Sequence, residues 1–250
     1  MTNCMCYSLR KTEAFECLLS AMYNRPYSPS TVADLNTIIQ LAEFYRALPI
    51  LSATMTPALL KSAMFNSRNA MCRFLNLSRE VIQVAKQLRN TDLFRECFVH
   101  EVGKYDAGDE TNHLLDDDIH QLIRREHSVI CKRIMRTQSR LLLRYQRFPI
   151  WISPDMAMVI DLEDNPTRTA DFFRAVKCQV DSLSVTTRWA GGHLDPYMKM
   201  AKSELDGLMR NNLRLDRTNF GSASDHNDDY FLCADIKDDE MPWDSGVIDW

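Results

Sequence analysis

The sequence predicts an all-α protein, and three observations carry that prediction. Glycine occurs 7 times in 250 residues, although average usage is roughly 7% and β-rich folds need glycine in their tight turns. Apolar residues recur at three- and four-residue spacing along most of the chain, as they do on one face of an α-helix. Capping residues precede several of these stretches. We therefore expect a helical array with one long helix and an irregular C-terminal tail.

The first expected helix lies at the start of region 12–62. Thr12 occupies the N-cap position, and Pro26 requires the helix to end a few residues earlier. Apolar residues at i, i+3, i+4 and i+7 define its expected inward face. That face consists of Phe15, Leu18, Leu19 and Met22.

Two more helices complete this region. Thr31 and Asp34 have the spacing of a capping box, so a second helix should open there and end near Leu48. Pro49 then lies in the first turn of a third helix, where the missing proline N–H costs no hydrogen bond. The expected inward residues of the third helix are Ile50, Leu51, Met55, Leu59 and Leu60.

Residues 63–105 are expected to hold a pair of helices. After a weakly patterned stretch, Ser78 should cap the first helix, and Asn90 should end it. Thr91 should then begin the second. The expected inward face of the second helix consists of Phe94, Cys97, Phe98, Val102 and Tyr105.

One long helix, expected over 114–147, dominates the region 106–215. At ~1.5 Å per residue it would be about 51 Å long, so it should protrude from the other helices or brace them. Asn165–Pro166 and Asp195–Pro196 mark the starts of two shorter helices, because proline favours the first helical turn.

Charge is segregated along the chain. Thirty basic and 34 acidic residues give a net charge of -4, but the long helix carries a basic strip and the tail, residues 216–250, is acidic and aromatic. The basic strip, whose members recur every three or four residues, consists of Arg133, Arg136, Arg140, Arg144 and Arg147. The side chains expected to anchor the tail by apolar burial are Tyr230, Phe231, Trp243 and Trp250.

The basic strip has three interpretations. It is a solvated helix face, a binding surface for nucleic-acid phosphates, or the docking site of the protein's own acidic tail. A near-neutral chain has no global basic field, so nucleic acid is possible but not favoured. We expect the tail to dock on the strip, because opposite charges on one chain meet at a high effective concentration.

No motif in the sequence indicates catalysis. The glycine-rich phosphate loops and the Gly-x-Ser-x-Gly nucleophile motif do not occur. Cys97 and His100 have helical i, i+3 spacing, but Cys97 lies on the expected apolar face, where a buried and inert thiol is expected. The cysteines also lack the paired spacing of a zinc site. We therefore expect a non-enzyme with no catalytic residue, no cofactor and no metal.

The N-terminus and the cysteines indicate an intracellular protein. Residues 1–11 lack the apolar core of a signal peptide, and no window reaches the ~20 apolar residues of a membrane span. The 8 cysteines are mostly scattered singly, as reduced thiols are. A cytoplasmic or nuclear location without membrane contact is expected.

Several segments carry a resemblance to a known family. The sequences AFECLLSAMY (14–23) and LAEFYRALPIL (41–51) resemble the second half of a BTB/POZ domain. Segments 85–89, 93–97 and 229–250 are similar to filamentous-fungal BTB proteins. The resemblance implies a partial BTB-like helical region over 12–62, post-BTB helices over 63–105, and a protein-interaction scaffold or adaptor. BTB domains pair with themselves or with other proteins, and a subset recruits substrates to a cullin-family ubiquitin ligase.

The resemblance also raises two specific questions. In the cullin-binding subset a hydrophobic residue, any residue and an acid precede the corresponding helix, and Val32 with Asp34 fits that pattern. Asp34 equally completes the capping box with Thr31. The strands and helices of the first BTB half do not precede residue 12 in this sequence. In a complete BTB domain, four apolar residues would face that first half: Leu18, Leu19, Ile38 and Ile39. Either later helices of this chain cover them, or the chain is a fragment with an exposed apolar patch.

Overall fold

A computed structural model describes residues 2–66, 68–145, 167–189, 196–215 and 230–244. Within these ranges the chain forms helices, turns and irregular segments and no β-strand, so the predicted all-α fold is confirmed. The helices in chain order are α1 Thr2–Met22, α2 Val32–Phe44, α3 Leu48–Leu60, α4 Ala63–Asn66, α5 Arg68–Gln87, α6 Thr91–Lys104, η1 Glu110–Leu114, α7 Asp117–Tyr145, α9 Thr167–Trp189, α10 Pro196–Leu208 and η4 Asp238–Glu240.

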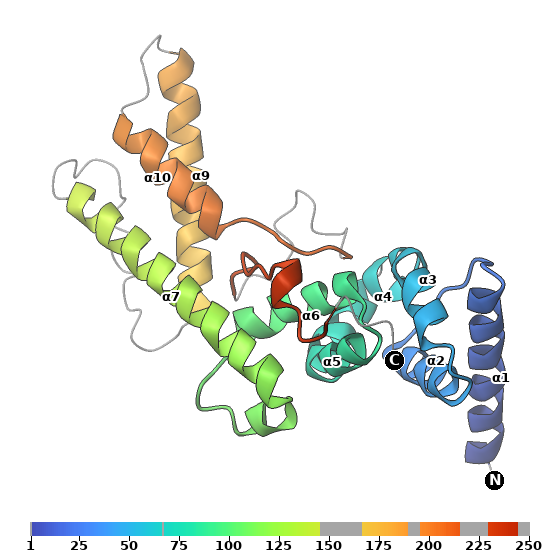
Figure 1. Cartoon of the computed structure of the whole chain (residues 1–250). Coiled ribbons are helices and arrows are strands. Elements are labelled where there is room, and N and C mark those ends of the chain that lie inside the picture. Colours follow the sequence, from blue (N-terminus) through green and yellow to red (C-terminus); the bar gives the residue numbers. More distant parts are fainter. Residues whose placement is uncertain (1, 67, 146–166, 190–195, 216–229, 245–250) are drawn as a thin grey trace.

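The helices form a compact part and a projecting part (Figure 1). Helices α1 to α6 pack in succession, with α5 against α6 and α1 against both α2 and α3. Helix α7 packs on α6 at one end and on α10 further along, and α10 packs on α9. The long helix expected over 114–147 is 29 residues long, or about 43 Å. It begins at Asp117 because Leu115 is extended, with ψ of 146°, and separates it from η1.

Helix α1 corrects the first expectation. It begins at Thr2 rather than at a cap on Thr12, and its buried side chains are Ala14, Leu18 and Ala21. Phe15 and Met22, expected to face inward, are 37% and 45% exposed. The two alanines let the helix axis approach α2 and α3 closely, which bulkier side chains would prevent.

Helix α2 starts as the sequence predicts and ends earlier. The Thr31 hydroxyl accepts the Asp34 N–H at 3.1 Å, and the Asp34 carboxylate accepts the Thr31 N–H at 3.0 Å. The helix ends at Phe44 rather than near Leu48, because Arg46 adopts a left-handed conformation with φ of 55°. Pro49 lies in the first turn of α3 as predicted, but Ile50 is 42% exposed instead of buried.

The expected caps around α5 are wrong in position. Ser78 lies inside α5, which begins at Arg68, and its hydroxyl donates to the Leu75 carbonyl at 2.8 Å. Asn90 does not end α5 but caps α6, accepting the Leu93 N–H at 2.9 Å. The inward face of α6 is as predicted for Phe94, Cys97, Phe98 and Val102, whereas Tyr105 is partly buried.

A single hydrophobic cluster connects the compact part with the projecting part. Leu18, Ile38 and Ile39 belong to it and are at most 2% exposed, while Leu19 is half-buried. The packing of α1 and α2 on each other, on α3 and on α5 therefore buries three of the four apolar residues for which the sequence left an exposed patch open, and these are Leu18, Ile38 and Ile39. Phe65 and Phe74, with ring centroids 4.8 Å apart, form part of the interior that these helices supply.

The stretch Leu48–Asn66 has the length and apolar composition of a membrane-crossing helix. Of its side chains, Leu51, Met55 and Phe65 are fully buried in the protein core. The stretch is also divided at Ser62, whose hydroxyl donates to the Pro29 carbonyl.

Candidate interaction surfaces

Large apolar side chains gather on the outer side of α1 and at the end of α2. We call this group the aromatic surface; it consists of Phe15, Met22 and Tyr23 with Phe44 and Tyr45. Tyr23 is 72% and Phe44 78% exposed, which is unusual for side chains of this size. The Phe15 and Tyr45 rings lie 5.7 Å apart, and Tyr45 meets Phe44 edge to face at 5.0 Å. These contacts join α1 and α2 into one exposed apolar area.

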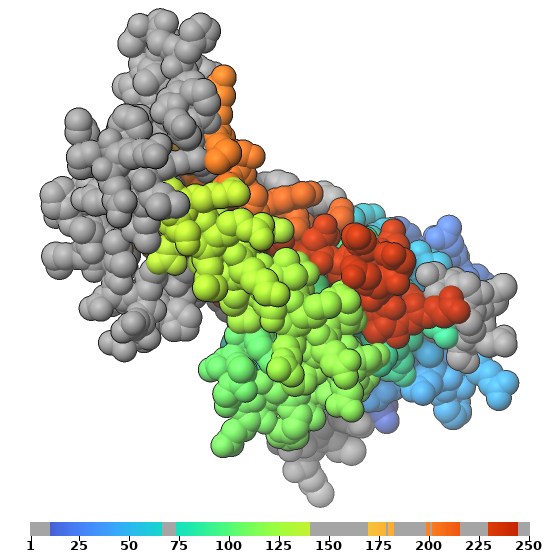
Figure 2. Space-filling view, turned by 60° about the vertical axis from the view of Figure 1, so that its left-hand side comes forward, coloured from blue at the N-terminus to red at the C-terminus, as the bar shows by residue number. Residues whose placement is uncertain are grey.

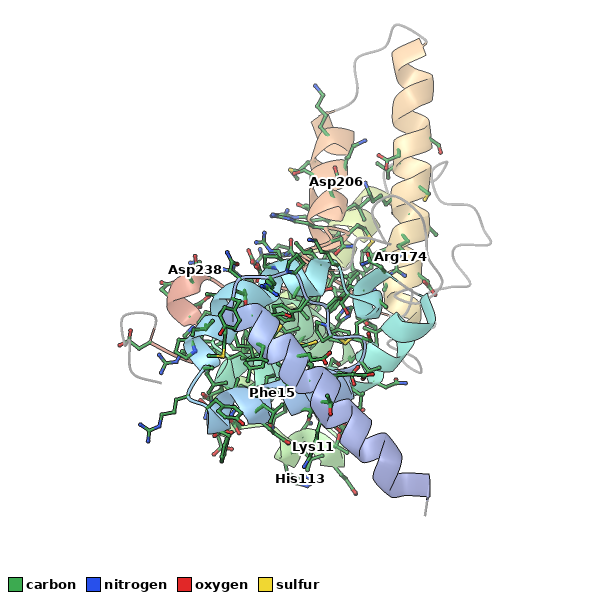
Figure 3. The ribbon with its side chains drawn as sticks, turned by 90° about the vertical axis from the view of Figure 1, so that its right-hand side faces the viewer. Lys11, Phe15, His113, Arg174, Asp206 and Asp238 are labelled. Carbon is green, nitrogen blue, oxygen red and sulfur yellow. The ribbon has the colours of Figure 1, made fainter. Side chains whose placement is uncertain are left out.

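Two apolar strips on one helix explain this surface. Positions 14, 18 and 21 of α1 face the core, while positions 15, 19 and 22 follow the same helical spacing on the outer side. The left-handed turn at Arg46 ends α2 so that Tyr45 lies against Phe15. Figure 3 shows α1 at the outside of the molecule, with Lys11 and Phe15 labelled.

Charged side chains of both signs flank the aromatic surface. Lys11 lies one turn before Phe15 on α1, Glu16 follows Phe15 directly, and Arg25 follows the end of the helix. On α2, Glu43 and Arg46 bracket Phe44 and Tyr45. All five charged side chains are exposed. The rim of the surface is therefore neither strongly acidic nor strongly basic.

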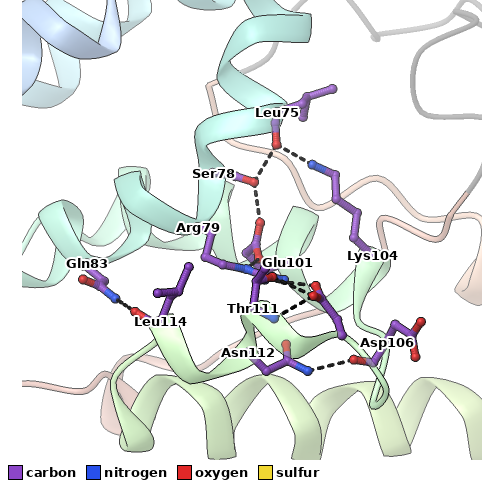
Figure 4. A network of polar contacts seen from close by, with 11 residues as sticks. Leu75, Ser78, Arg79, Gln83, Glu101, Lys104, Asp106, Thr111, Asn112 and Leu114 are labelled. Atoms are coloured by element: carbon purple, nitrogen blue, oxygen red, sulfur yellow. Dashed lines mark hydrogen bonds and ion pairs between the residues drawn. The ribbon is translucent and has the colours of Figure 1, made fainter.

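A polar network joins α5, α6 and η1 (Figure 4). The Glu101 carboxylate is buried; it accepts the Ser78 hydroxyl and the Arg79 Nε–H, the latter at 3.1 Å. Arg79 also donates from Nη1 to Asp109 at 3.0 Å and to Thr111. Burial works against the charge on Arg79, but the hydrogen bonds and charges of Glu101 and Asp109 outweigh it and raise the guanidinium pKa.

An open cavity of about 870 Å³ lies against this network. Its lining includes Arg79, Glu101 and Lys104, and the Lys104 ammonium donates to the Leu75 carbonyl at 2.6 Å. The charged groups at its centre are thus already paired with each other or with the backbone. We infer that the network stabilises the packing of η1 on α5 and α6.

The C-terminal segment Tyr230–Asp244, which we call the tail segment, lies along α6. The Tyr230 hydroxyl is 2.8 Å from His100 Nδ1, and Trp243 meets Phe94 edge to face at 5.2 Å. Arg95 of α6 pairs with Asp238 at 2.7 Å. Figure 2 shows the tail segment in red across the surface beside α7.

Other side chains of the tail segment contact α7 and α9. Phe231 is 8% exposed and lies 6.0 Å from the Phe173 ring of α9. Arg125 of α7 pairs with Glu240 at 2.7 Å. Three of the four predicted anchors therefore pack on the protein's own helices, and Trp250 lies outside the described residues.

Gly103 shows how closely the tail segment approaches α6. A Cβ atom at Gly103 would lie 2.3 Å from Tyr230 Cδ2 and 2.8 Å from the Phe231 carbonyl oxygen. Upstream of the tail segment, the buried Glu96 carboxylate of α6 accepts the N–H groups of Arg214 and Leu215 at 2.6 and 2.8 Å. Residues more than 100 positions apart are thereby held on one helix.

The basic strip does not hold the tail segment in the way expected. Arg140 pairs with Glu204 of α10 rather than with a tail carboxylate. Arg133 lies beside Cys233, where burial raises the thiol pKa and the guanidinium opposes the rise. The tail carboxylates instead meet Arg95 and Arg125, because the tail segment follows α6 and meets α7 at Arg125 and Arg133.

The other members of the strip make no described contact with the tail segment. Arg136 is exposed on α7. The Arg144 side chain and Arg147 lie outside the described residues.

Val32 and Asp34 contribute to the fold at the start of α2. Val32 is 7% exposed, and the Asp34 carboxylate belongs to the capping box with Thr31. The capping interpretation thus accounts for Asp34, and Ala33 is the exposed member of this short motif.

Two thiol–imidazole pairs share a helix: Cys97 with His100 on α6, and Cys131 with His127 on α7, where Cys131 Sγ lies 3.6 Å from His127 Nε2. Burial raises the Cys97 pKa well above its ordinary value. His100, fully buried, has its pKa lowered to about 3 by burial and by the nearby Lys104 charge. On α7, burial raises the Cys131 pKa and lowers the His127 pKa, which favours the unreactive neutral forms of both. The described ranges contain no cluster of three or more metal-binding side chains.

Sequence reasoning did not find the aromatic surface, because it assigned Phe15 and Met22 to the core. A signal was present: α1 carries apolar residues on more of its circumference than one buried face requires.

Comparison with known proteins finds one family model that matches part of the chain. Residues 65–143 match the family model "Domain of unknown function (DUF8004)". The match spans the end of α4, all of α5, α6 and η1, and α7 up to residue 143, so it includes the polar network and the helix on which the tail segment lies. The aromatic surface lies before it. The searches of curated proteins and of solved structures gave no significant match.

Proposed function

We propose that the protein is a non-catalytic scaffold or adaptor that holds a protein partner on the aromatic surface of α1 and α2. The observations that carry the proposal are the exposure of Tyr23 after the end of α1, at 72%, and of Phe44 at the end of α2, at 78%, with Phe44 in the contacting group of rings Phe15, Tyr45 and Phe44. Exposed aromatic clusters with a polar rim are typical of protein-binding sites, because their burial removes a large apolar area from water.

The resemblance to BTB proteins supports the same class of function. The segments that carry it, 14–23 and 41–51, contain every residue of the aromatic surface. A cullin-family scaffold is therefore one partner to test, in keeping with the adaptor subset. Cytoplasm or nucleus remains the proposed location.

The nucleic-acid alternative has less support. A phosphate-binding strip needs arginines that are not already engaged, whereas Arg140 of the strip pairs with Glu204 and Arg133 lies beside Cys233.

Proximity labelling in cells that express the full chain tests the scaffold proposal. The wild type is compared with the double variant Tyr23→Ser, Phe44→Ser and with the control Met135→Ser, which removes a 66% exposed side chain from α7. We expect the double variant, and not the control, to lose a defined set of labelled proteins. The cullin version of the proposal requires a cullin in that set. Identical labelling by all three proteins would overturn the scaffold proposal.

A further inference from the structure

We propose that the exposed side of α7 binds an acidic helix of another protein, at a second site separate from the aromatic surface. From residue 121 to residue 140, every exposed charged side chain of α7 is basic. We call these five side chains the α7 basic face: Arg124, Arg125, Lys132, Arg136 and Arg140. A scaffold joins partners and so needs more than one binding surface, but the evidence for this site does not depend on the aromatic surface.

Two members of the α7 basic face already bind carboxylates of this chain. Arg125 Nη2 lies 2.7 Å from Glu240 Oε1 of the tail segment, and Arg140 pairs with Glu204 of α10. Both guanidinium groups remain partly exposed, and each has five N–H donors in total. Carboxylates are therefore a chemistry that this side of α7 binds, and a further acidic segment would continue an existing contact.

The other three members have no ion-pair partner among the residues that the structure describes. Arg124, Lys132 and Arg136 are exposed and stand at positions i, i+8 and i+12 of one helix, which lie within about a third of its circumference. Lys132 and Arg136 are one turn apart, where like charges repel. Figure 2 shows α7 in yellow-green at the surface, beside the tail segment. An acidic partner would remove this repulsion and gain the unused donors.

The shape of the α7 basic face suits a helical partner. The face extends for about 24 Å from residue 124 to residue 140, and two helices pack with their axes ~8–10 Å apart. Carboxylates at every fourth position of a partner helix repeat every ~6 Å, as Lys132 and Arg136 do. Val129, 41% exposed, lies one turn from both Arg125 and Lys132 and offers an apolar contact. The expected partner is an amphipathic helix of about 16 residues with acidic side chains along one side.

Nucleic acid fits this face less well, because carboxylates of the tail segment lie beside it. Glu240 contacts Arg125, and the exposed Asp238 and Asp239 directly precede Glu240. A DNA duplex carries about one negative charge per 1.7 Å and would continue past the face onto these carboxylates. A short acidic helix can end before it meets them, so the observed charges favour a protein partner.

Fluorescence polarisation with the purified full chain tests this site. The probe is a labelled synthetic helix of about 16 residues, with glutamate at every fourth position and leucine on the neighbouring side. At low salt we expect a dissociation constant of about 10 to 100 μM. Added salt should weaken binding, because the contacts are exposed ion pairs. The same peptide with glutamine in place of glutamate should bind about tenfold more weakly or less.

Charge reversal on α7 connects binding to named residues. Lys132→Glu with Arg136→Glu should weaken binding of the acidic peptide by about tenfold or more. The matched control, Lys61→Glu with Arg210→Glu, changes the net charge equally at exposed side chains outside α7, and its affinity should stay within about twofold of the wild type. Circular dichroism and thermal unfolding establish that both variants are folded.

Three results would overturn the acidic-helix inference. The first is the absence of peptide binding by the wild type up to about 1 mM. The second is an equal loss of binding in both charge-reversal variants, which would assign the effect to net charge. The third concerns a labelled DNA duplex of about 16 base pairs, measured in parallel. If it binds more tightly than the peptide and depends on Lys132 and Arg136, the partner is nucleic acid.

This inference and the proposed function fail separately. Proximity labelling that ignores Tyr23 and Phe44, together with peptide binding that depends on Lys132 and Arg136, removes the aromatic surface and keeps the site on α7. Labelling that depends on Tyr23 and Phe44, with no peptide binding, removes the site on α7 and keeps the proposed function.

Discussion

Two aromatic regions of this protein differ in what covers them. On α6, the rings of Tyr230 and Trp243 meet His100 and Phe94, and carboxylates of the tail segment pair with arginines. On α1 and α2, rings of the same types contact one another and remain 37% to 78% exposed. The comparison shows that aromatic and charged composition is not sufficient to fix a contact; the chain must also supply a segment that reaches the site.

Removing the Glu96 carboxylate should have the largest effect on the covered region. In Glu96→Ala, the N–H groups of Arg214 and Leu215 lose their buried acceptor, and we expect a loss of about 4 kcal/mol in the free energy of unfolding. Urea denaturation measures it. The exposed Glu80→Ala on α5 is the control and should change stability by less than about 0.5 kcal/mol. Equal stability of wild type and Glu96→Ala would show that the Glu96 carboxylate does not hold Arg214 and Leu215 on α6.

Gly103→Ala should weaken the tail contact next most strongly. The new Cβ would overlap the Tyr230 ring and the Phe231 carbonyl, and the carbonyl belongs to the backbone and moves only with the chain. We expect about 2 to 3 kcal/mol of destabilisation and faster proteolysis within the tail segment.

The matched control for Gly103 is Gly207→Ala on α10. No atom lies within 4 Å of a Cβ built at Gly207, and alanine favours a helix, so this change should stabilise the protein by about 0.5 to 1 kcal/mol. Destabilisation by both substitutions to the same extent would show that the tail contact is not the cause.

Acid should lower the free energy of unfolding, because protonation of the buried His100 is unfavourable in the folded protein. Its pKa is about 3 in the folded protein and about 6.5 in the unfolded chain. The unfolded state therefore binds more protons between these values, and stability is greatest above pH 6.5 and falls as the pH decreases toward 3. From pH 7 to pH 5 the expected loss from this group is about 2 kcal/mol.

Unfolding measured at several pH values, with His100→Gln for comparison, tests this dependence. Glutamine can keep a hydrogen bond to the Tyr230 hydroxyl but does not titrate, so this variant should lose less stability between pH 7 and pH 5. His113→Gln, on the exposed η1, is the control and should retain the wild-type slope. A slope unchanged in His100→Gln would assign the acid sensitivity to other groups.

The uncovered region should show the smallest stability effect. Tyr23→Ser and Phe44→Ser replace exposed side chains, so each should change the free energy of unfolding by less than about 0.5 kcal/mol at low protein concentration. Thermal unfolding at about 1 μM protein is the measurement. A loss above about 2 kcal/mol would mean that these rings support the monomer fold rather than a contact surface.

Local signals in the sequence predicted local structure well. The capping box of Thr31 and Asp34 and the first-turn Pro49 are present because their hydrogen bonds and dihedral limits involve neighbouring residues alone. The inward face of α6 was also predicted, since its apolar residues occupy one side of the helix. The start of α1 was not, because residues before Thr12 continue the helix without a recognisable cap.

The buried face of α1 and the position of the tail segment depend on contacts between distant residues, so the sequence did not predict them. Helix α1 has two apolar strips of equal periodicity, and only close packing on α2 and α3 selects the one with Ala14 and Ala21. The tail segment was expected on the arginines of α7, but apolar burial against Phe94 and the space over Gly103 place it on α6. Charge patterns along a sequence do not reveal such steric fits.

Because α7 is long, a small rotation at one end produces a large displacement at the other. Helix α7 packs on α6 at one end and on α10 further along, and α10 in turn packs on α9. Over about 43 Å, a rotation of about 5° at the α6 end displaces the far tip by about 4 Å. The Arg125–Glu240 pair lies close to that pivot. The tail segment contacts both α7, through the Arg125–Glu240 pair, and α9, through Phe231 and Phe173, so we expect its removal to change the angle between these two helices.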